Sequence, residues 1–112
     1  MSSIAVPRVF APISAATALG VLTVSATDAA AIYPGAKAWI QKDDGSVPSA
    51  RVLIVSVVGT AVKCRRFKND NETAPGINYG VSDLSAFNTG SHLNQEVQVA
   101  PIDPSNAKRN FA

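Results

Sequence analysis

The sequence is poor in the residues that usually carry chemistry or cross-links. Its 112 residues include one cysteine and one histidine. A single cysteine excludes an internal disulfide framework, and this pair cannot supply the four ligands of an ordinary zinc site. We therefore expect no catalytic residues, no metal, no cofactor and no enzymatic activity. His92 is expected to be a solvated loop residue, and Cys64 a small buried side chain.

Charged and aromatic residues are also scarce. Charged residues make up 16% of the chain, against about 25% in soluble domains, and aromatic residues 6%. Hydrophobic residues reach 46%, so a core is possible, but small side chains such as Ala and Val must build it. A sparsely charged surface fits either a small stable secreted or bacterial domain, or a protein covered by other molecules, including copies of itself.

Long apolar runs are absent. No run of eighteen apolar residues occurs, so we expect no membrane-spanning helix and no membrane partner. Residues 1–31 have a mildly apolar middle, broken by Pro12 and several polar residues, and end in Ala29-Ala30-Ala31. This outline resembles a secretory signal, so a small exported protein cleaved after Ala31 remains an alternative.

What the sequence does contain is a pattern of short β-strands. Two β-rich runs between Leu53 and Phe67 flank Gly59-Thr60, which predicts a β-hairpin. Residues 20–25, 35–42 and 96–100 are further predicted strands, and apolar residues on both faces of 49–57 predict a strand covered on both sides. Residues 27–32 favour one helical turn capped by Thr27 or Asp28. The length allows one domain, so we expect an all-β barrel or sandwich of five to six strands over residues 19–100.

Residues 1–18 are expected to form an extended arm outside this domain, because Pro7 and Pro12 discourage a helix. Such an arm cannot offset its own ordering entropy. Its apolar side chains are therefore expected to dock on another protein. They are Ile4, Val6, Val9, Phe10 and Ile13. Residues 101–112 are expected to be a short polar tail.

Four of the ten basic residues lie within six positions, at Lys63, Arg65, Arg66 and Lys68. Strand alternation places Lys63 and Arg65 on one face and Arg66 on the other. Three interpretations remain open for this cluster. It can be a solvated edge that blocks aggregation, a contact with acidic patches on a neighbouring protein, or a contact with nucleic-acid phosphates.

The order of parts over residues 35–86 carries one resemblance. The parts are Gly35 opening a strand, Asp44-Gly45 at its tip, Ala50-Arg51-Val52 on the next strand, Val62 to Phe67 on a third, and Val81 to Leu84 closing. This order resembles the Tudor-like small barrel. The resemblance implies a binding module that contacts nucleic acid or an acidic peptide through strand 62–68. It also implies an aromatic cage, to which Trp39, Phe67, Tyr79 and Phe87 are the candidates. The chain departs from the pattern at Lys42, Asp43 and Asp44, where paired aromatic residues are expected.

A second resemblance covers about residues 19–67. Its parts are Leu19 to Ser25, then Tyr33-Pro34-Gly35-Ala36-Lys37-Ala38, then Arg51 to Val55, then Gly59-Thr60-Ala61-Val62. This succession looks like small virion proteins of tailed phages. The resemblance implies a non-enzymatic structural protein, present in many copies on the virion and assembled in the host cytoplasm. Our leading hypothesis is a capsid decoration (cement) protein that binds the major capsid protein through its β body and terminal arms, with a neck or head–tail adaptor as a variant.

Overall fold

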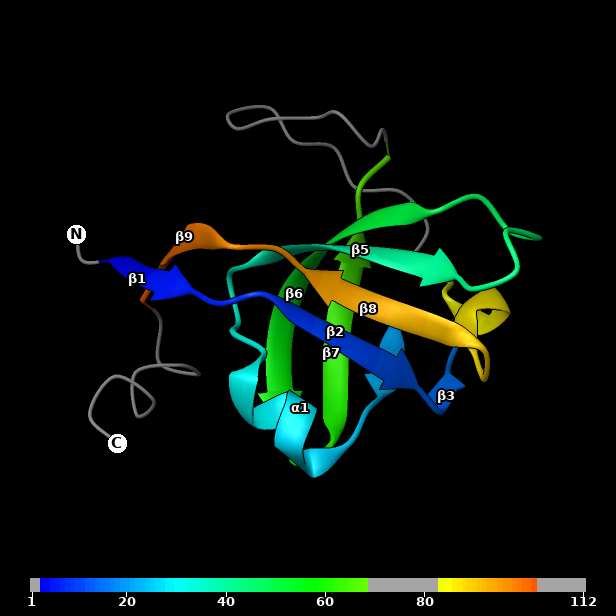
Figure 1. Ribbon diagram of the computed structural model, residues 1–112, viewed down its shortest axis with the longest axis horizontal. Helices are drawn as coiled ribbons and strands as arrows, with labels where there is room; N and C mark the ends of the chain where they lie inside the picture. Colours follow the sequence, from blue (N-terminus) through cyan, green and yellow to red (C-terminus); the bar gives the residue numbers. More distant parts are fainter. Residues whose placement is uncertain (1–2, 69–82, 103–112) are drawn as a thin grey trace.

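The computed structural model describes residues 3–68 and 83–102, and these are nearly all β. The elements in chain order are β1 (Ser3–Val6), β2 (Val9–Ile13), β3 (Ala15–Ala16), β4 (Val21–Thr23), α1 (Ala26–Ala31), β5 (Lys37–Lys42), β6 (Ala50–Val58), β7 (Ala61–Arg66), the 3-10 turn η1 (Ser85–Phe87), β8 (Ser91–Gln95) and β9 (Gln98–Pro101). Seven strands form one antiparallel sheet in the order β2-β8-β5-β6-β7-β4-β3, which curls into a nearly closed barrel (Figure 1). The expected all-β fold is confirmed in its barrel form, although the barrel sheet has seven strands where five to six were expected.

One chain segment closes the barrel. Its first half, β2, pairs with β8 at one end of the sheet, and its second half, β3, pairs with β4 at the other end. Between the halves, the Ser14 N–H donates to the Thr23 carbonyl at 2.9 Å. The residues that join the two ends of the sheet therefore come from the N-terminal part of the chain.

The first two strands and the last two form one long antiparallel ladder. The register is unchanged from Ser3 opposite Pro101, in the β1-β9 pair, to Ile13 opposite Ser91, in the β2-β8 pair. Pairing is interrupted only at Pro7 and Arg8. Beyond this interruption β1 and β9 project from the barrel as a two-stranded sheet (Figure 1). We call β1, β9 and Val97, which directly precedes β9, the terminal ribbon.

The N-terminal segment therefore differs from the arm that the sequence suggested. Val6, Val9 and Ile13 are 1%, 7% and 3% exposed and lie in the core of the chain's own domain, while Ile4 packs partly against that core. Only Phe10 of the expected docking residues points outward, at 48% exposure. The physical reason is strand alternation: residues 9–13 are buried and exposed in turn, and β8 offers them backbone partners. The described part of the expected tail begins inside β9, and residues 103–112 lie outside the described residues.

The short helix α1 covers one end of the barrel and packs against β2. Its N-cap is Ser25, whose hydroxyl accepts from the Asp28 N–H at 3.1 Å, so the expected caps Thr27 and Asp28 are wrong. Ala29 of the helix is buried in the core. A cut after Ala31 would remove β1 to β4 and with them several core side chains, so the described fold needs the segment that an exported form would lose.

The predicted hairpin is present at Gly59, which joins β6 to β7 with a φ of 59°. Inward residues of β6 are fully buried, namely Ala50, Val52 and Ile54. On the opposite face Val55 is 37% exposed. The expectation that this strand is covered on both sides is therefore wrong, because its second face is the outer surface of the barrel.

Candidate interaction surfaces

His92 lies in a strand that the sequence did not predict, because the residues around it are mostly polar. The segment Ser91-His-Leu-Asn-Gln95 forms β8, paired with β2 on one side and β5 on the other. The expected loop position of His92 is therefore wrong. Its ring stacks on Phe10 with centroids 4.2 Å apart and an interplanar angle of 6°, and its Nδ1 contacts the Asp43 carboxylate. These contacts connect the β5–β6 loop to β8 and β2.

Gln95 is a buried polar residue at the other end of β8 from His92, next to α1. It is fully buried, and its side chain makes three hydrogen bonds. The amide oxygen accepts from the Tyr33 N–H at 3.0 Å, and the amide nitrogen donates to the carbonyls of Pro7 at 3.0 Å and Ala31 at 2.9 Å. Gln95 thus ties the interruption in the long ladder to the end of α1 and to the start of the next loop.

Gln98 performs a similar task at the base of the terminal ribbon. Its side-chain oxygen accepts from the Lys37 N–H at 2.7 Å, and its nitrogen donates to the Lys37 carbonyl at 2.6 Å. The side-chain amide therefore pairs with Lys37 as a backbone peptide group would in a ladder. This contact attaches β9 to the first residue of β5.

The basic cluster expected from the sequence is divided between two faces. Lys63 and Arg65 are exposed on the outer face of β7, and Lys68 is exposed beyond its end. Arg66 is half-buried on the other side of the strand. There its positive charge contributes to lowering the pKa of Asp83, behind the larger effect of hydrogen bonds from Ser85. The four residues do not form one site.

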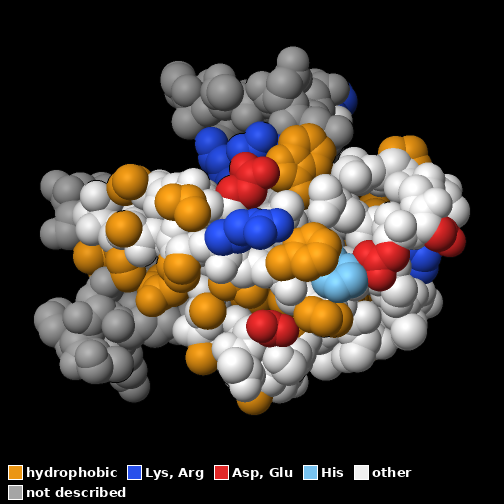
Figure 2. Space-filling model, viewed as in Figure 1, with side chains coloured by type: hydrophobic (Ala, Val, Ile, Leu, Met, Phe, Trp, Pro, Cys, Tyr) orange, Lys and Arg blue, Asp and Glu red, His pale blue; other side chains and the backbone are white. Residues whose placement is uncertain are grey.

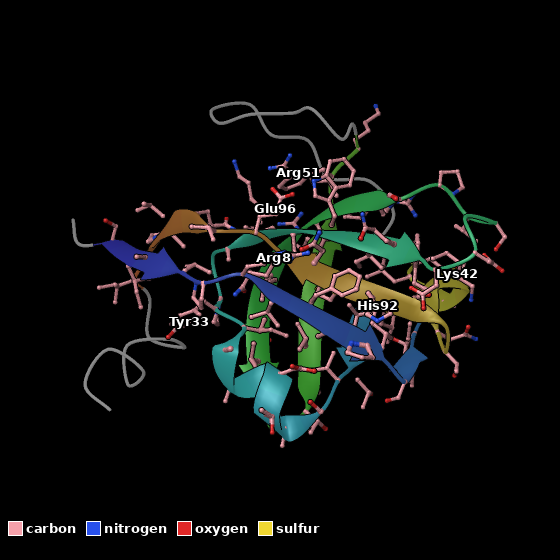
Figure 3. The ribbon with its side chains drawn as sticks, viewed as in Figure 1. Arg8, Tyr33, Lys42, Arg51, His92 and Glu96 are labelled. Atoms are coloured by element: carbon pink, nitrogen blue, oxygen red, sulfur yellow. The ribbon has the colours of Figure 1, made fainter. Side chains whose placement is uncertain are left out.

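The strand registers bring other basic and aromatic residues together on the outer face of the barrel. One row across four strands is Phe10, Asn94, Trp39 and Arg51, each opposite the next. A neighbouring row across three strands is Lys37, Leu53 and Arg65. We call the following side chains the basic–aromatic face: Arg8, Phe10, Lys37, Trp39, Arg51 and Arg65. Figure 3 shows Arg8 and Arg51 on this side with Glu96 between them.

Each aromatic ring of this face lies beside a guanidinium group. The Arg51 Cζ lies 5.4 Å from the Trp39 ring centroid, and the Arg8 Cζ lies 5.7 Å from the Phe10 centroid. Such pairs are cation–π contacts. Two buried polar atoms beside Trp39, Arg51 Nε and Asn94 Oδ1, have no hydrogen-bond partner among the described residues. In Figure 2 blue and orange side chains lie side by side here.

Sequence reasoning missed this face because its cations are dispersed in the chain. Arg8, Lys37 and Arg51 lie far apart and next to no other basic residue. Only the register of three strands shows that they share a surface with Arg65. A periodicity of two in each strand was the available signal, but it does not say which strands are neighbours.

The aromatic cage implied by the Tudor-like resemblance is not formed by the described candidates. Phe67 and Phe87 are 2% and 1% exposed and fill the interior. Trp39 is on the outer face, on the opposite side of the sheet. Tyr79 lies outside the described residues. The resemblance therefore extends to the barrel and not to the cage.

The terminal ribbon presents the second surface. Val97 is 76% and Val99 71% exposed, and Figure 2 shows apolar side chains gathered over this end of the molecule. In the described parts of the chain β1 pairs with β9 alone. Proteins usually protect such edges with charge, proline or a covering element. Pro12 and α1 do this for β2, whereas Ser3–Val6 contains neither a charge nor a proline.

Within residues 3–68 and 83–102 there is no pocket and no group of three potential metal ligands. Cys64 is buried, as expected, and burial raises the pKa of its thiol to about 12. None of the described helices is long and apolar enough to cross a membrane. No protein family, curated protein or solved structure matches this chain. Its function must therefore be argued from the two surfaces.

Proposed function

We propose that this chain is a non-enzymatic structural protein of a bacteriophage virion that decorates the capsid. Its partner is the major capsid protein, and the terminal ribbon makes the contact. The observation that carries the proposal is the ribbon itself, which combines exposed Val97 and Val99 with an outer edge of β1 that pairs with no other strand among the described residues. The resemblance of residues 19–67 to small virion proteins supports the choice of assembly.

The ribbon replaces the flexible arm as the docking element. Val6, Val9 and Ile13 stabilise the chain's own core, so a partner must use the opposite side of the ribbon. Burying Val97 and Val99 on a partner would contribute about 1.5–3 kcal/mol each. A partner strand could also pair with the free edge of β1, as in β-strand addition. On a shell with many identical subunits, this modest contact would be repeated at every copy.

Co-sedimentation with empty capsid shells tests the proposal. We expect the unchanged protein to sediment with the shells and the double variant Val97→Lys with Val99→Lys to remain in the supernatant, because two lysines would have to be desolvated in the contact. Val58→Lys is the matched control, since Val58 is equally exposed, at 75%, but lies in the β6–β7 hairpin. It should sediment like the unchanged protein.

Failure of the unchanged protein to bind shells, or its absence from purified particles, would contradict capsid decoration. Equal loss of binding in Val58→Lys and in the double variant would contradict the role of the ribbon. Both lysine variants replace exposed side chains, so a shared loss would not be explained by unfolding. Circular dichroism of each variant verifies this.

A further inference from the structure

We propose that the basic–aromatic face is a binding site for single-stranded nucleic acid. Phe10 and Trp39 would contact bases, and Arg8, Lys37, Arg51 and Arg65 would contact phosphates. This goes beyond capsid decoration and does not depend on it, because the terminal ribbon is a different surface. It also differs from a contact through strand 62–68, since Arg66 points to the other face and three of the four cations lie outside that strand.

The charge on this face has one predominant sign. Four cations come from three strands and from the residue before β2, at positions 8, 37, 51 and 65. Figure 3 shows one acidic residue, Glu96, between Arg8 and Arg51, and Asp43 lies at the margin of the face against His92, while Lys63 adds a further exposed cation on β7. A polyanion laid across the sheet would therefore meet Arg8 just before β2 and then one cation on each of β5, β6 and β7. Such contacts are independent of sequence and weaken with salt.

The aromatic residues offer surfaces on which bases can stack. Phe10 is 48% exposed, and His92 stacks flat on one side of its ring. Arg8 is exposed and lies 5.7 Å from the Phe10 centroid, so it can leave the ring for a phosphate while a base takes its place. The Arg51 guanidinium lies over the Trp39 ring. Because bases stack on guanidinium planes as well as on aromatic rings, a base can stack on this Arg51–Trp39 pair. Phe10 and Trp39 are two strands apart, about 9–10 Å, so one extended strand can reach both.

The shape of the face favours a single strand over other polyanions. It is the outer surface of a curled sheet, and the described residues form no pocket in it. Extended peptides are often held by adding a strand at a sheet edge, and at the β2 edge of this face Pro12 and α1 hinder such pairing. A duplex keeps its bases stacked inside and cannot use the rings. Small β-barrels of the OB type bind single strands on such an outer face.

A fluorescence titration tests this site directly, because Trp39 is the only tryptophan. The probe is a fifteen-nucleotide oligothymidine, added at low and at moderate salt to the full chain. We expect saturable quenching of Trp39 and a parallel rise in the anisotropy of labelled oligonucleotide. With four phosphate contacts, the logarithm of the binding constant should fall with a slope of about −2.8 against the logarithm of salt concentration.

Variants separate stacking from charge. Phe10→Ala should weaken binding at least about fivefold, while Val58→Ala, which shortens an even more exposed apolar side chain in the β6–β7 hairpin, should leave it unchanged. Arg8→Gln with Arg65→Gln should make the salt slope shallower by about 1.4. Absence of quenching and of anisotropy change at low salt would overturn the proposal. So would equal affinity for a duplex of the same length, or for polyglutamate, which would indicate a surface for acidic protein.

Discussion

At the scale of single residues, Gln95 shows how a barrel with a thin apolar core is stabilised. Its side chain is buried and satisfies three backbone groups, at Tyr33, Pro7 and Ala31. Leu has a similar volume but no polar atoms. We expect Gln95→Leu to lower the free energy of unfolding by about 2–4 kcal/mol, because buried backbone groups lose their partners. Urea denaturation followed by circular dichroism measures this.

Gln41→Leu is the control for this prediction. Gln41 lies on the outer face of β5, opposite His92, and the same change there should alter stability by no more than about 0.5 kcal/mol. If the two variants were equally stable, the three hydrogen bonds of Gln95 would not contribute to folding.

Cys64 makes stability depend on pH at the alkaline end. Burial raises the pKa of its thiol to about 12 from an ordinary value of 9.0, so between these two pH values the folded state keeps the proton that the unfolded state loses. The stability contributed by the protonated thiol is complete below pH 9 and is lost as pH rises from 9 toward 12. At pH 10 the loss should be about 1.4 kcal/mol. Urea unfolding at pH 8 and pH 10 measures it.

Other groups also titrate in this range, so the comparison needs Cys64→Ala. This variant is less stable throughout because it leaves a small cavity, but it lacks the thiol. Its stability should therefore fall less between pH 8 and pH 10 than that of the unchanged protein. Identical slopes would show that the thiol ionises equally in both states.

At the scale of elements, β1 has two faces with opposite roles. Val6 is buried in the core and its neighbour Ala5 is exposed. We expect Val6→Asp to cost about 3 kcal/mol or more, since it removes apolar burial and places a charge in the core. Ala5→Asp, the same new side chain one position earlier, should change stability by about 0.5 kcal/mol or less. Thermal unfolding of both variants as monomers provides the measurement.

The two variants distinguish a strand from a free arm. If residues 3–6 were an arm that folds only on a partner, neither aspartate would affect the isolated protein. Similar melting temperatures for Val6→Asp and Ala5→Asp would therefore contradict the pairing of β1 with β9.

The elements also show which sequence signals were sufficient. The hairpin at Gly59 and the strand over 37–42 were predictable because strong local patterns mark them: a glycine turn and alternation of apolar and polar residues. Strand β8 was not predictable, because its inward residues include Ser91 and Gln95, and polar residues at these positions are typical of a loop. Their burial is explained by hydrogen bonding in the case of Gln95, and such a bond depends on residues distant in the chain.

At the scale of the whole molecule, the all-β barrel followed from composition and turns, but its closure did not. The barrel closes only if Val9–Ile13 has a strand to pair with. That strand is β8, which the polar sequence did not predict. Without β8 the apolar residues of the N-terminal segment had no place in the domain, so the sequence suggested an arm. The basic–aromatic face depends on the same information, because β8 lies between Phe10 and Trp39.

Both surfaces depend on one structural claim, that residues 9–13 belong to the barrel in an isolated molecule. Hydrogen exchange of dilute monomer, read by mass spectrometry, tests it most directly. We predict that peptides covering Val9–Ile13 exchange much more slowly than an unfolded chain, as do those covering Ser91–Gln95, with which they pair. Exchange of residues 9–13 at the rate of an unfolded chain, while β5 to β7 stay protected, would contradict it.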